Sequence, residues 1–396
     1  MIRDMIQELA RSKSADIVAV RRYLHQHPEL SFHEEHTSQY IQEYLTRIGV
    51  RFTTGWAGHG VVGMIEGRHP DRGVVALRAD MDALPIQEEN DVPYKSLHDG
   101  VMHACGHDVH TASLLGAAAI LHELRGKFNG TIKLIFQPAE EKLPGGASLM
   151  IREGVLKDPE PAAILGQHVH PQLPAGSVGF RAGQAMGSSD EINLRVIGKG
   201  GHGAMPHLTI DPVAISAQLI TALQLIVSRV SDPVTPSVLT FGSIHSDGGS
   251  FNVIPGSVSL AGTFRTFDEQ WRTTAHEKIR RIAQEMAAGF GATCEVHIEK
   301  GYPSLTNHAE LTSRCMASAR AYLGADNVHE IPARLTSEDF AYYTQHLPGC
   351  FYRLGVANAA KGITAPVHTP QFDIDESALV VGSGLMAWLA VSEIGS

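Results

Sequence analysis

The sequence predicts an α/β domain with a largely parallel mixed sheet, interrupted by an inserted ferredoxin-like α+β domain. Up to residue 183, near-continuous apolar strands alternate with helical segments, as in a sheet that is covered on both faces. Between residues 184 and 297 the strands alternate apolar and polar residues, and the elements follow the order βαββαβ. The first pattern then returns. We therefore expect one domain from residues 1–183 and 298–396 and a second from residues 184–297.

The elements of the first domain follow from apolar periodicity and from their boundaries. Helical spacing predicts a helix at the N-terminus, a second that Pro28 closes and a third that Gly49 ends. A long apolar run after residue 110 predicts a further helix. Runs with β-branched residues and glycine boundaries predict the strands GVVGMIEG, GVVALRAD, GTIKLIFQ, AAILGQHV and GSVGF.

The inserted domain begins with the one-sided strand DEINLRVIGKG. A long helix follows, with Asp211 as its cap and Pro212 in its first turn. The remaining elements are the strands SVLTFGSIHS, SVSLAGTFRT and TCEVHIEKGY and the helix DEQWRTTAHEKIRRIAQEMAAGF. After them, AELTSRCMASARAYLG and ESALVVGSGLMAWLAVSEI predict two helices that belong to the first domain again.

The composition excludes several classes of protein. The chain has 396 residues and a net charge of −10, without a basic block, so we expect no nucleic-acid partner, because binding phosphates requires concentrated positive charge. No window approaches the roughly 18 consecutive apolar residues of a membrane span, and the N-terminus is too charged for a signal peptide. Four scattered cysteines do not make a disulfide framework, so we expect a cytoplasmic protein with reduced thiols.

Two short motifs resemble known signatures but lack their context. GHGVVG, residues 58–63, matches a dinucleotide fingerprint, yet its glycines lead directly into a strand instead of opening a helix. A glycine-rich turn is the better interpretation. HEEH, residues 33–36, is one residue too short for a metalloprotease helix, so we interpret it as a solvated helix face.

Chemically informative residues follow the predicted strands. Cys105 and His107 are two residues apart with a glycine between them, so a thiolate and an imidazole can face one divalent ion. A buried free cysteine beside a capped helix is the alternative. Glu140 and Glu141 directly follow the strand TIKLIF, where neighbouring carboxylates repel each other unless a cation neutralises one and leaves the other as a base. A solvated loop pair is the alternative there.

Two more histidines lie in comparable places. His168 ends the apolar strand AAILGQH, and His368 lies between prolines in a loop near the C-terminus. Each alone is more often a hydrogen-bonded histidine than a ligand. Together with the cysteine, His107 and the glutamates, they favour a metal site built from distant parts of the chain.

The ordered set of motifs resembles one metallopeptidase family over essentially the whole chain. The motifs are RADMDALP, MHACGHDVH, FQPAEE, GQHVHP, GGHGAMPH, FNVIP, SEDFA and VHTPQFDIDE. They are similar to the amidohydrolase branch of the aminoacylase/carboxypeptidase-G family, which contains hippurate hydrolases, N-acyl-amino-acid amidohydrolases and plant auxin-conjugate hydrolases. The resemblance implies a catalytic domain with two divalent metal ions and an inserted lid domain through which the protein forms a homodimer.

The resemblance also implies roles for individual residues. The implied metal ligands are Cys105, His107, Glu141, His168 and His368. Glu140 would be the general base, and Asp82 would orient a ligand imidazole. The wider family has a histidine ligand where this chain has Asp80, and this branch uses the cysteine instead.

Three residues of the lid complete the expected machinery. His202, in GKGGHGAMPH, would donate a hydrogen bond to the developing oxyanion in the partner subunit's site. Asn252 and Arg265 would hold the substrate, the arginine through a carboxylate clamp, although both residues could equally support only the lid fold.

The function that the resemblance implies is metal-dependent hydrolysis of the amide bond of small N-acyl amino acids, with an acetyl or aromatic acyl group. A dipeptidase or carboxypeptidase of the same family is the near alternative. A nucleotide-dependent oxidoreductase that uses GHGVVG and a non-catalytic metal-binding relative are the alternatives from other classes. The Cys/His/Glu set accepts zinc, manganese, cobalt or nickel, so it does not identify the metal.

Overall fold

The computed structural model describes residues 1–394 and divides the chain into two compact units. Unit 1 consists of Met1–Ala185, Thr306–Ala333 and the described part of Asp339–Ser396. Unit 2 consists of Met186–Leu305 and Arg334–Glu338. The main segment of unit 2 runs from 186 to 305, where we expected 184 to 297, and its last strand, β13 (Thr293–Lys300), crosses the expected end.

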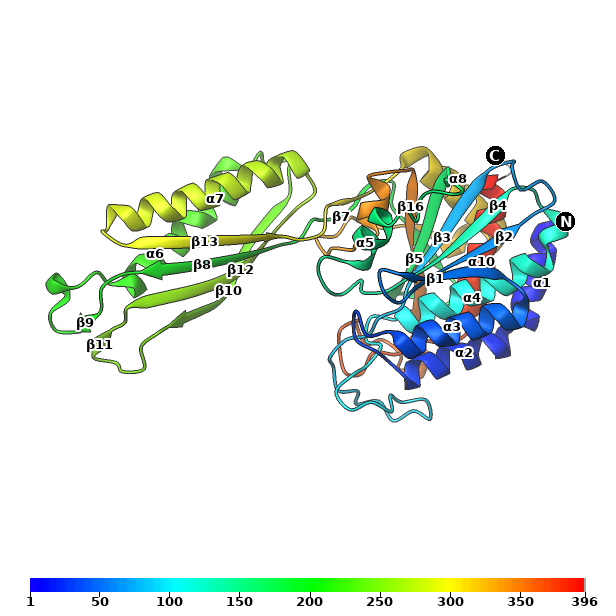
Figure 1. Ribbon diagram of the computed structural model, residues 1–396, viewed down its shortest axis with the longest axis horizontal. Coiled ribbons are helices and arrows are strands. Elements are labelled where there is room, and N and C mark those ends of the chain that lie inside the picture. The colour runs from blue at the N-terminus through cyan, green and yellow to red at the C-terminus, as the bar shows by residue number, and fades with distance from the viewer. Residues whose placement is uncertain (395–396) are drawn as a thin grey trace. The chain divides into compact units, whose positions relative to one another are not determined.

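Unit 1 is built on a mixed sheet whose central strands are parallel (Figure 1). In order across the sheet, the strands are β1 (Arg51–Trp56), β2 (Gly60–Glu66), β4 (Thr131–Gln137), β3 (Val74–Asp80), β5 (Ala163–Pro174), β16 (Gly349–Ala357), β6 (Val178–Phe180) and β15 (Val328–Glu330). β3 pairs in parallel with both β4 and β5, and β5 pairs in parallel with β16. The predicted largely parallel mixed sheet is therefore confirmed.

Helices cover this sheet. They are α1 (Ile2–Ser12), α2 (Ser14–Gln26), α3 (Glu35–Ile48), α4 (His107–Glu123), α5 (Gly146–Arg152), α8 (Ala309–Leu323), α9 (Ala341–Thr344) and α10 (Ala378–Ile394). α4 and α10 pack against each other and against β3, while α1, α2 and α3 pack on α4. Every side chain of α4 from His107 to Leu121 is buried, because its run of alanine, leucine and glycine lets neighbouring elements approach on all sides.

Unit 2 has the predicted ferredoxin-like order of elements. Its sheet has the strand order β10 (Ser237–Ser246), β12 (Ser257–Thr266), β8 (Asp190–Ile197) and β13, and its long helices are α6 (Pro212–Leu225) and α7 (Glu269–Gly289). Asp211 caps α6 as predicted, since its carboxylate accepts from the backbone N–H groups of Val213 and Ala214. A short two-stranded ladder of β9 (Gly201–His202) and β11 (Val253–Ile254) completes this unit. A second, of β7 (Gly183–Met186) and β14 (Leu305–Asn307), lies where the chain passes from one unit to the other.

One described helix is long and apolar enough to cross a membrane. It runs over Pro212–Val230, with a mean hydropathy of 1.6, and 28% of the tested window is buried. We expected no such segment, because serine, threonine and glutamine interrupt its apolar run, but they leave its average hydropathy high. The buried side chains of this helix pack in the core of unit 2, among them Ile215, Leu219, Leu223 and Ile226.

Candidate metal centre

The fold brings the candidate residues to one edge of the sheet in unit 1. β3 and β4 run in parallel and end at Asp80 and Gln137, so the loops that carry Asp82 and the Glu140–Glu141 pair leave the same edge. Cys105 lies just before α4, and His107 is the first residue of that helix. His168 lies within β5. We expected it to be the last residue of this strand, which was wrong: β5 runs on to Pro174 because β16 continues to pair with it.

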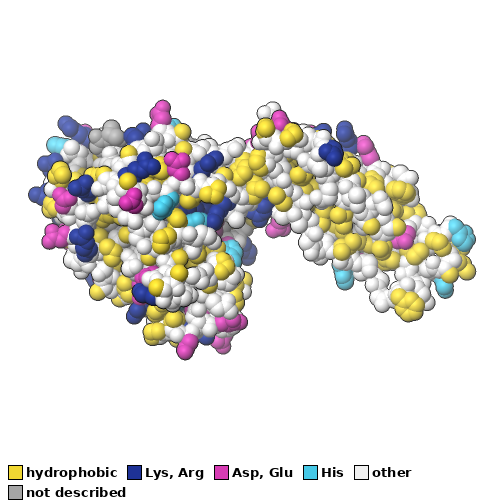
Figure 2. Space-filling view, turned by 180° about the vertical axis from the view of Figure 1, so that it is seen from behind, with side chains coloured by type: hydrophobic (Ala, Val, Ile, Leu, Met, Phe, Trp, Pro, Cys, Tyr) yellow, Lys and Arg dark blue, Asp and Glu magenta, His cyan; other side chains and the backbone are white. Residues whose placement is uncertain are grey.

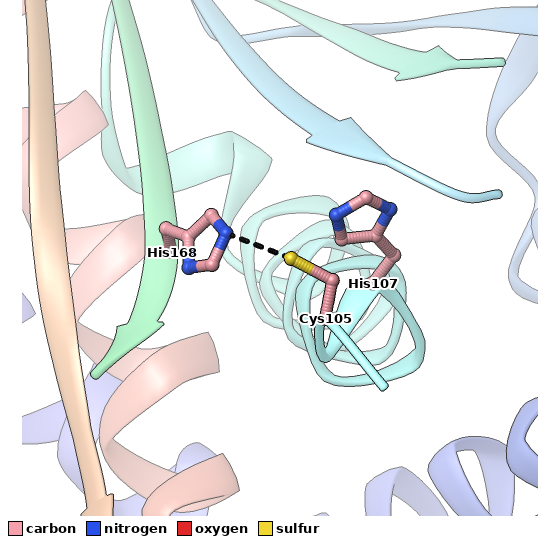
Figure 3. A group of neighbouring side chains, drawn as sticks. All are labelled: Cys105, His107 and His168. Atoms are coloured by element: carbon pink, nitrogen blue, oxygen red, sulfur yellow. Dashed lines mark hydrogen bonds between the residues drawn. The ribbon is translucent and has the colours of Figure 1, made fainter. Parts of the chain in front are cut away.

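All five predicted ligands converge. The Sγ atom of Cys105 lies 3.4 Å from Nε2 of His168 (Figure 3) and 3.3 Å from Nε2 of His368. The same nitrogen of His368 is 3.3 Å from Oε1 of Glu141, which in turn is 3.9 Å from Nε2 of His107. The donor atoms therefore form one connected group, with the Glu141 carboxylate between the His368 side and the His107 side.

Hydrogen bonds on the far side of two of the imidazoles, those of His107 and His168, turn their second nitrogen towards this group. Nδ1 of His107 lies 3.1 Å from Oδ1 of Asp82, and Nδ1 of His168 lies 2.8 Å from the carbonyl oxygen of Val169. A protonated Nδ1 at each position leaves Nε2 with its lone pair directed at the other donors. The role expected for Asp82 thus matches its position. Its role in the reaction stays a prediction.

The three histidines of HACGHDVH have three different surroundings. Only His107 belongs to the donor group described above. His110 lies behind it, with Nδ1 2.5 Å from Oδ1 of Asp80, while its Nε2 accepts from the backbone N–H of Val169 at 2.9 Å. His103 is buried, and burial lowers its pKa to about 4, so this ring stays neutral at physiological pH.

The donor set fits divalent metal ions. Nε2 of His107 and Oε1 of Glu141 are buried without a hydrogen-bond partner among the described residues, and buried polar atoms in proteins are otherwise almost always paired. Ligand atoms about 2.0–2.3 Å from a shared tetrahedral ion lie roughly 3.3–3.8 Å from one another. The separations of 3.3 and 3.4 Å around Cys105 match this range. The residues could therefore hold metal on both sides of Glu141.

The negative charge of the carboxylates around the donor group also favours the binding of a cation. Burial, followed by the charges of Glu141 and Glu140, raises the pKa of the Cys105 thiol well above its usual value. Burial alone would lower the pKa of His107, but Asp80 and Asp82 raise it to about 10. Without a metal ion, a proton on this imidazole balances the surrounding carboxylates. A bound cation would replace that proton and favour the thiolate.

Glu140 lies beside the donor group, with a carboxylate oxygen within 4.8 Å of a donor atom of His107 and of one of Glu141. Its side chain is buried, and its Oε1 accepts from the backbone N–H of Asp339 at 3.3 Å. The carboxylate of Asp339 is held by Arg78 at 2.6 Å and by the amide of Gln137 at 2.9 and 2.8 Å. A buried arginine thus ties β3 to the segment that contacts the candidate base.

Two residues that contact the segments around Glu140, Arg78 and Glu34, were not predicted from the sequence to belong to the site. Arg78 gave a signal, since a lone arginine in the apolar strand VVALRAD is buried only when it is paired. Glu34 contradicts the prediction that HEEH is a solvated helix face. His33, Glu35 and His36 are exposed, whereas Glu34 is fully buried and accepts from the backbone of Ala139. Periodicity does not reveal this contact, because α3 begins only at Glu35.

The candidate lid residues lie in unit 2. His202 is exposed in β9 and pairs with Val253 of β11, next to Asn252, which is also exposed. Arg265 lies elsewhere in this unit, at the end of β12, where it is half-buried and donates to the carbonyl of Leu335 at 3.2 Å. The structure thus brings His202 and Asn252 together but separates Arg265 from them.

Comparisons with known proteins identify the family of the chain. Residues 76–391 match the profile of the peptidase family M20/M25/M40. An N-acyl-L-amino acid amidohydrolase of Geobacillus stearothermophilus is 45% identical over 310 residues, which cover 78% of this chain and 83% of the relative. Thermostable carboxypeptidase 1 of Saccharolobus solfataricus is 41% identical over 378 residues, or 95% of this chain and 94% of the relative.

A solved structure agrees with this match. The YXEP protein of Bacillus subtilis, described as a dinuclear metal-binding peptidase of the M20 family, aligns with a TM-score of 0.82. Its sequence is 36% identical, and the alignment covers 97% of this chain and 99% of that protein. The chain therefore belongs to the peptidase family M20/M25/M40 and is a hydrolase of amide bonds.

Proposed function

We propose that this enzyme hydrolyses the amide bond of N-acyl amino acids and releases a carboxylic acid and a free amino acid. The convergence of Cys105, Glu141 and His368 with the two other donors, directly beside Glu140, carries this proposal. The identity to an N-acyl-L-amino acid amidohydrolase over most of the chain supports the substrate class.

The five donor side chains, Glu141 among them, would hold two divalent ions. When bound, such ions polarise the amide carbonyl and make a water molecule acidic enough to lose its proton near neutral pH. Glu140 would accept that proton and later pass it to the departing nitrogen. The N–H of Asp339 would hold Oε1 of Glu140 in place for this exchange.

Unit 2 would complete the site as a lid and join two chains into a homodimer. Exposed hydrophobic side chains on its surface support this (Figure 2). They include Met205, Leu208, Phe251 and Val253, near His202 and Asn252, and Val213, Leu225 and Val230 on the long apolar helix. His202 would donate to the oxyanion in the partner's site. Asn252 and Arg265, which lie apart in unit 2, would hold the substrate, Arg265 by its carboxylate.

We place the enzyme in the cytoplasm, acting on small molecules without a membrane or nucleic-acid partner. All four cysteines are free thiols, which is typical of a reducing compartment. The net charge of −10 disfavours contact with nucleic acid or with anionic lipid surfaces.

Hydrolysis of short peptides is the second candidate function. The thermostable carboxypeptidase is 41% identical over 95% of this chain, and a peptide bond presents the same amide to the site. The two substrate classes differ only in the group on the carbonyl side, so the same residues would act on both.

The test is Glu140→Gln assayed with N-acetyl, N-benzoyl and dipeptide substrates. We expect two metal ions to stay bound and the turnover to fall about 100- to 10,000-fold, because the amide cannot accept a proton. The control is Glu160→Gln, an exposed residue in unit 1 that should leave turnover unchanged. Wild-type turnover by Glu140→Gln would refute the assignment of the base, and faster cleavage of dipeptides than of acyl amino acids would favour the second function.

A further inference from the structure

We propose that Glu34 is a positioning residue that holds the backbone before Glu140 and thereby aims both Glu140 and Glu141. The proposal rests on the proposed function, in which these two residues are the base and a metal ligand. Glu34 itself contacts neither the substrate nor the donor atoms. It would act through the peptide of Ala139.

The side chain of Glu34 is placed for this role by the start of α3. Glu34 is the residue before the first turn, and its own carbonyl accepts from the backbone N–H of Ser38 at 2.9 Å. Its side chain is 0% exposed, although both neighbours, His33 and Glu35, are exposed. A glutamate is rarely buried in this way unless its carboxyl group makes a specific contact.

That contact is the backbone of Ala139. Oε1 of Glu34 accepts from the N–H of Ala139 at 2.7 Å, and the carbonyl of Ala139 accepts from the N–H of Gly146 at 2.9 Å. Ala139 has φ +52°, in the left-handed region that residues with a Cβ atom avoid. Surrounding contacts must impose such a conformation, and Glu34 supplies one of them on the N–H side.

A second buried carboxylate holds the other side of Glu140. Oδ2 of Asp82 accepts from the N–H of Glu141 at 2.9 Å and from Oγ of Ser31 at 2.6 Å. Ser31 and Glu34 belong to the same short segment, which therefore holds the N–H of Ala139 directly and the N–H of Glu141 through Asp82. The intervening Phe32 also has a left-handed backbone, with φ +69°.

The contact requires an acceptor atom of the right reach and does not require a charge. Oε2 of Glu34 is buried without a hydrogen-bond partner among residues 1–394. Burial, together with the nearby charge of Asp82, raises the pKa of Glu34 to about 8, which favours the neutral acid at physiological pH. A glutamine would offer the same carbonyl oxygen to Ala139. An aspartate would keep the acid but fall about 1.5 Å short, the length of one carbon–carbon bond.

The experiment compares Glu34→Gln with Glu34→Asp in the full-length enzyme, with Glu35→Gln as the exposed neighbouring control. Two quantities are measured: kcat and KM with an N-acyl amino acid, and the affinity of the metal-free protein for Mn²⁺ by isothermal titration. Thermal unfolding of each variant confirms that it is folded. Glu140→Gln is assayed in parallel.

We expect Glu34→Asp to lower kcat by about 10- to 100-fold with KM within about threefold of the wild-type value, because the base is misplaced while substrate contacts persist. Its Mn²⁺ affinity should fall by about 10-fold or more, as with other residues that orient ligands. Glu34→Gln and Glu35→Gln should stay within about threefold of wild type in both measurements.

Every other pattern overturns the proposal. If Glu34→Gln is as impaired as Glu34→Asp, the role of this residue needs an ionisable group. If Glu34→Asp behaves as wild type, the contact with Ala139 is dispensable. If only Glu34→Gln is impaired, the charge of the side chain matters and its reach does not. Should Glu34→Asp not fold, a loss of kcat in the folded Glu34→Gln variant still refutes the proposal and its retention supports it. Failure of the proposed function would instead show as full activity of Glu140→Gln, and the Mn²⁺ titration would still decide the role of Glu34.

Discussion

The imidazole of His107 is prepared for metal binding by two carboxylates that do different things. Asp82 lies 3.1 Å from its Nδ1 and fixes the ring, while Asp80 contributes charge from 3.9 Å on the Nε2 side. Both acids are fully buried, and each is compensated by other donors, Asp80 by Arg78 at 2.5 Å and Asp82 by Ser31 at 2.6 Å. The ligand nitrogen is thus oriented before any ion arrives, which lowers the cost of binding.

Glu34 should make folding stability depend on pH in the metal-free protein. Its pKa is raised from 4.5 to about 8, so the folded state binds this proton more tightly than the unfolded chain does. This contribution to stability is complete below pH 4.5 and is lost as the pH rises through 8. Glutamine does not titrate. The free energy of unfolding of Glu34→Gln should therefore rise relative to wild type by up to about 4 kcal/mol between pH 5 and pH 8.

Urea unfolding at the two pH values, with a chelator present, measures this difference. Glu35→Gln serves as the control, since an exposed side chain should show little change relative to wild type. A difference between Glu34→Gln and wild type that is the same at both pH values would contradict a raised pKa for Glu34.

At the residue scale, the sequence predicts the metal-donor residues better than it predicts the residues that hold them in position. Cys105 and His107 can be recognised because their spacing and residue types suit a metal ion. The contacts of Glu34 and Asp339 with the loop around Glu140 cannot be read in this way, because each joins segments more than 100 residues apart through backbone groups. Such contacts depend on where loops meet in the folded chain.

Helix α4, which begins with His107, is fixed in position relative to the rest of the donor group by buried ion pairs. Asp108, next to His107, accepts from Nε of the fully buried Arg21 at 2.8 Å and lies 2.7 Å from Nδ1 of His25. Arg21 also donates to Asp373 at 2.9 Å, in the loop that follows His368. One arginine of α2 therefore links the helix that begins with His107 to the loop that carries His368.

Replacing Arg21 by methionine should destabilise unit 1 and loosen the donor group. We expect a loss of about 3–5 kcal/mol in the free energy of unfolding, because Asp108 would be left as a buried charge without its main partner. The control is Arg22→Met. Its side chain is 43% exposed and pairs with Glu376, so its loss should cost less than about 1 kcal/mol.

Urea unfolding of both variants measures these free energies, and metal affinity provides a second measurement. Equal stability of the two variants would contradict the role that we assign to the buried Arg21–Asp108 pair. A normal metal affinity in Arg21→Met would show that metal binding does not depend on how Arg21 fixes the position of α4.

At the element scale, most strands and helices could be predicted because their boundaries have local causes. Asp211 and Pro212 mark the start of α6, and Gly49 ends α3 with a left-handed backbone. The clearest error concerns an element whose end depends on a partner. β5 continues past His168 because β16 pairs with it. This extension has no signal in its own residues.

The whole chain was recognisable because its motifs occur in a fixed order across both units. The mixed sheet of unit 1 and the inserted ferredoxin-like unit match that prediction, and the family is shown by the comparisons. The oligomeric state could not be predicted in the same way. It depends on exposed side chains of unit 2, and the apolar periodicity of the sequence does not show whether a second chain covers them. Homodimerisation and the action of His202 in trans therefore stay predictions.

Subunit mixing tests the predicted assembly. Glu140→Gln and His202→Ala should each have low activity, and after subunit exchange the mixture should recover about a quarter of the wild-type activity, since half of the symmetric dimers would carry one complete site. Exchange is confirmed by mass spectrometry of differently tagged chains. Confirmed exchange without recovery would contradict the action of His202 in trans, and a monomeric mass near 42.7 kDa in light scattering would contradict the dimer itself.

The proposed chemistry depends above all on a pair of metal ions bound jointly by Cys105, His107, Glu141, His168 and His368. Anomalous diffraction from crystals grown with Mn²⁺ or Zn²⁺ measures this directly. We predict two peaks about 3.5–4 Å apart, both bonded to Glu141, with Sγ of Cys105 and Nε2 of His368 within bonding distance of at least one of them. Peaks that leave either of those two atoms without a metal bond would contradict the prediction.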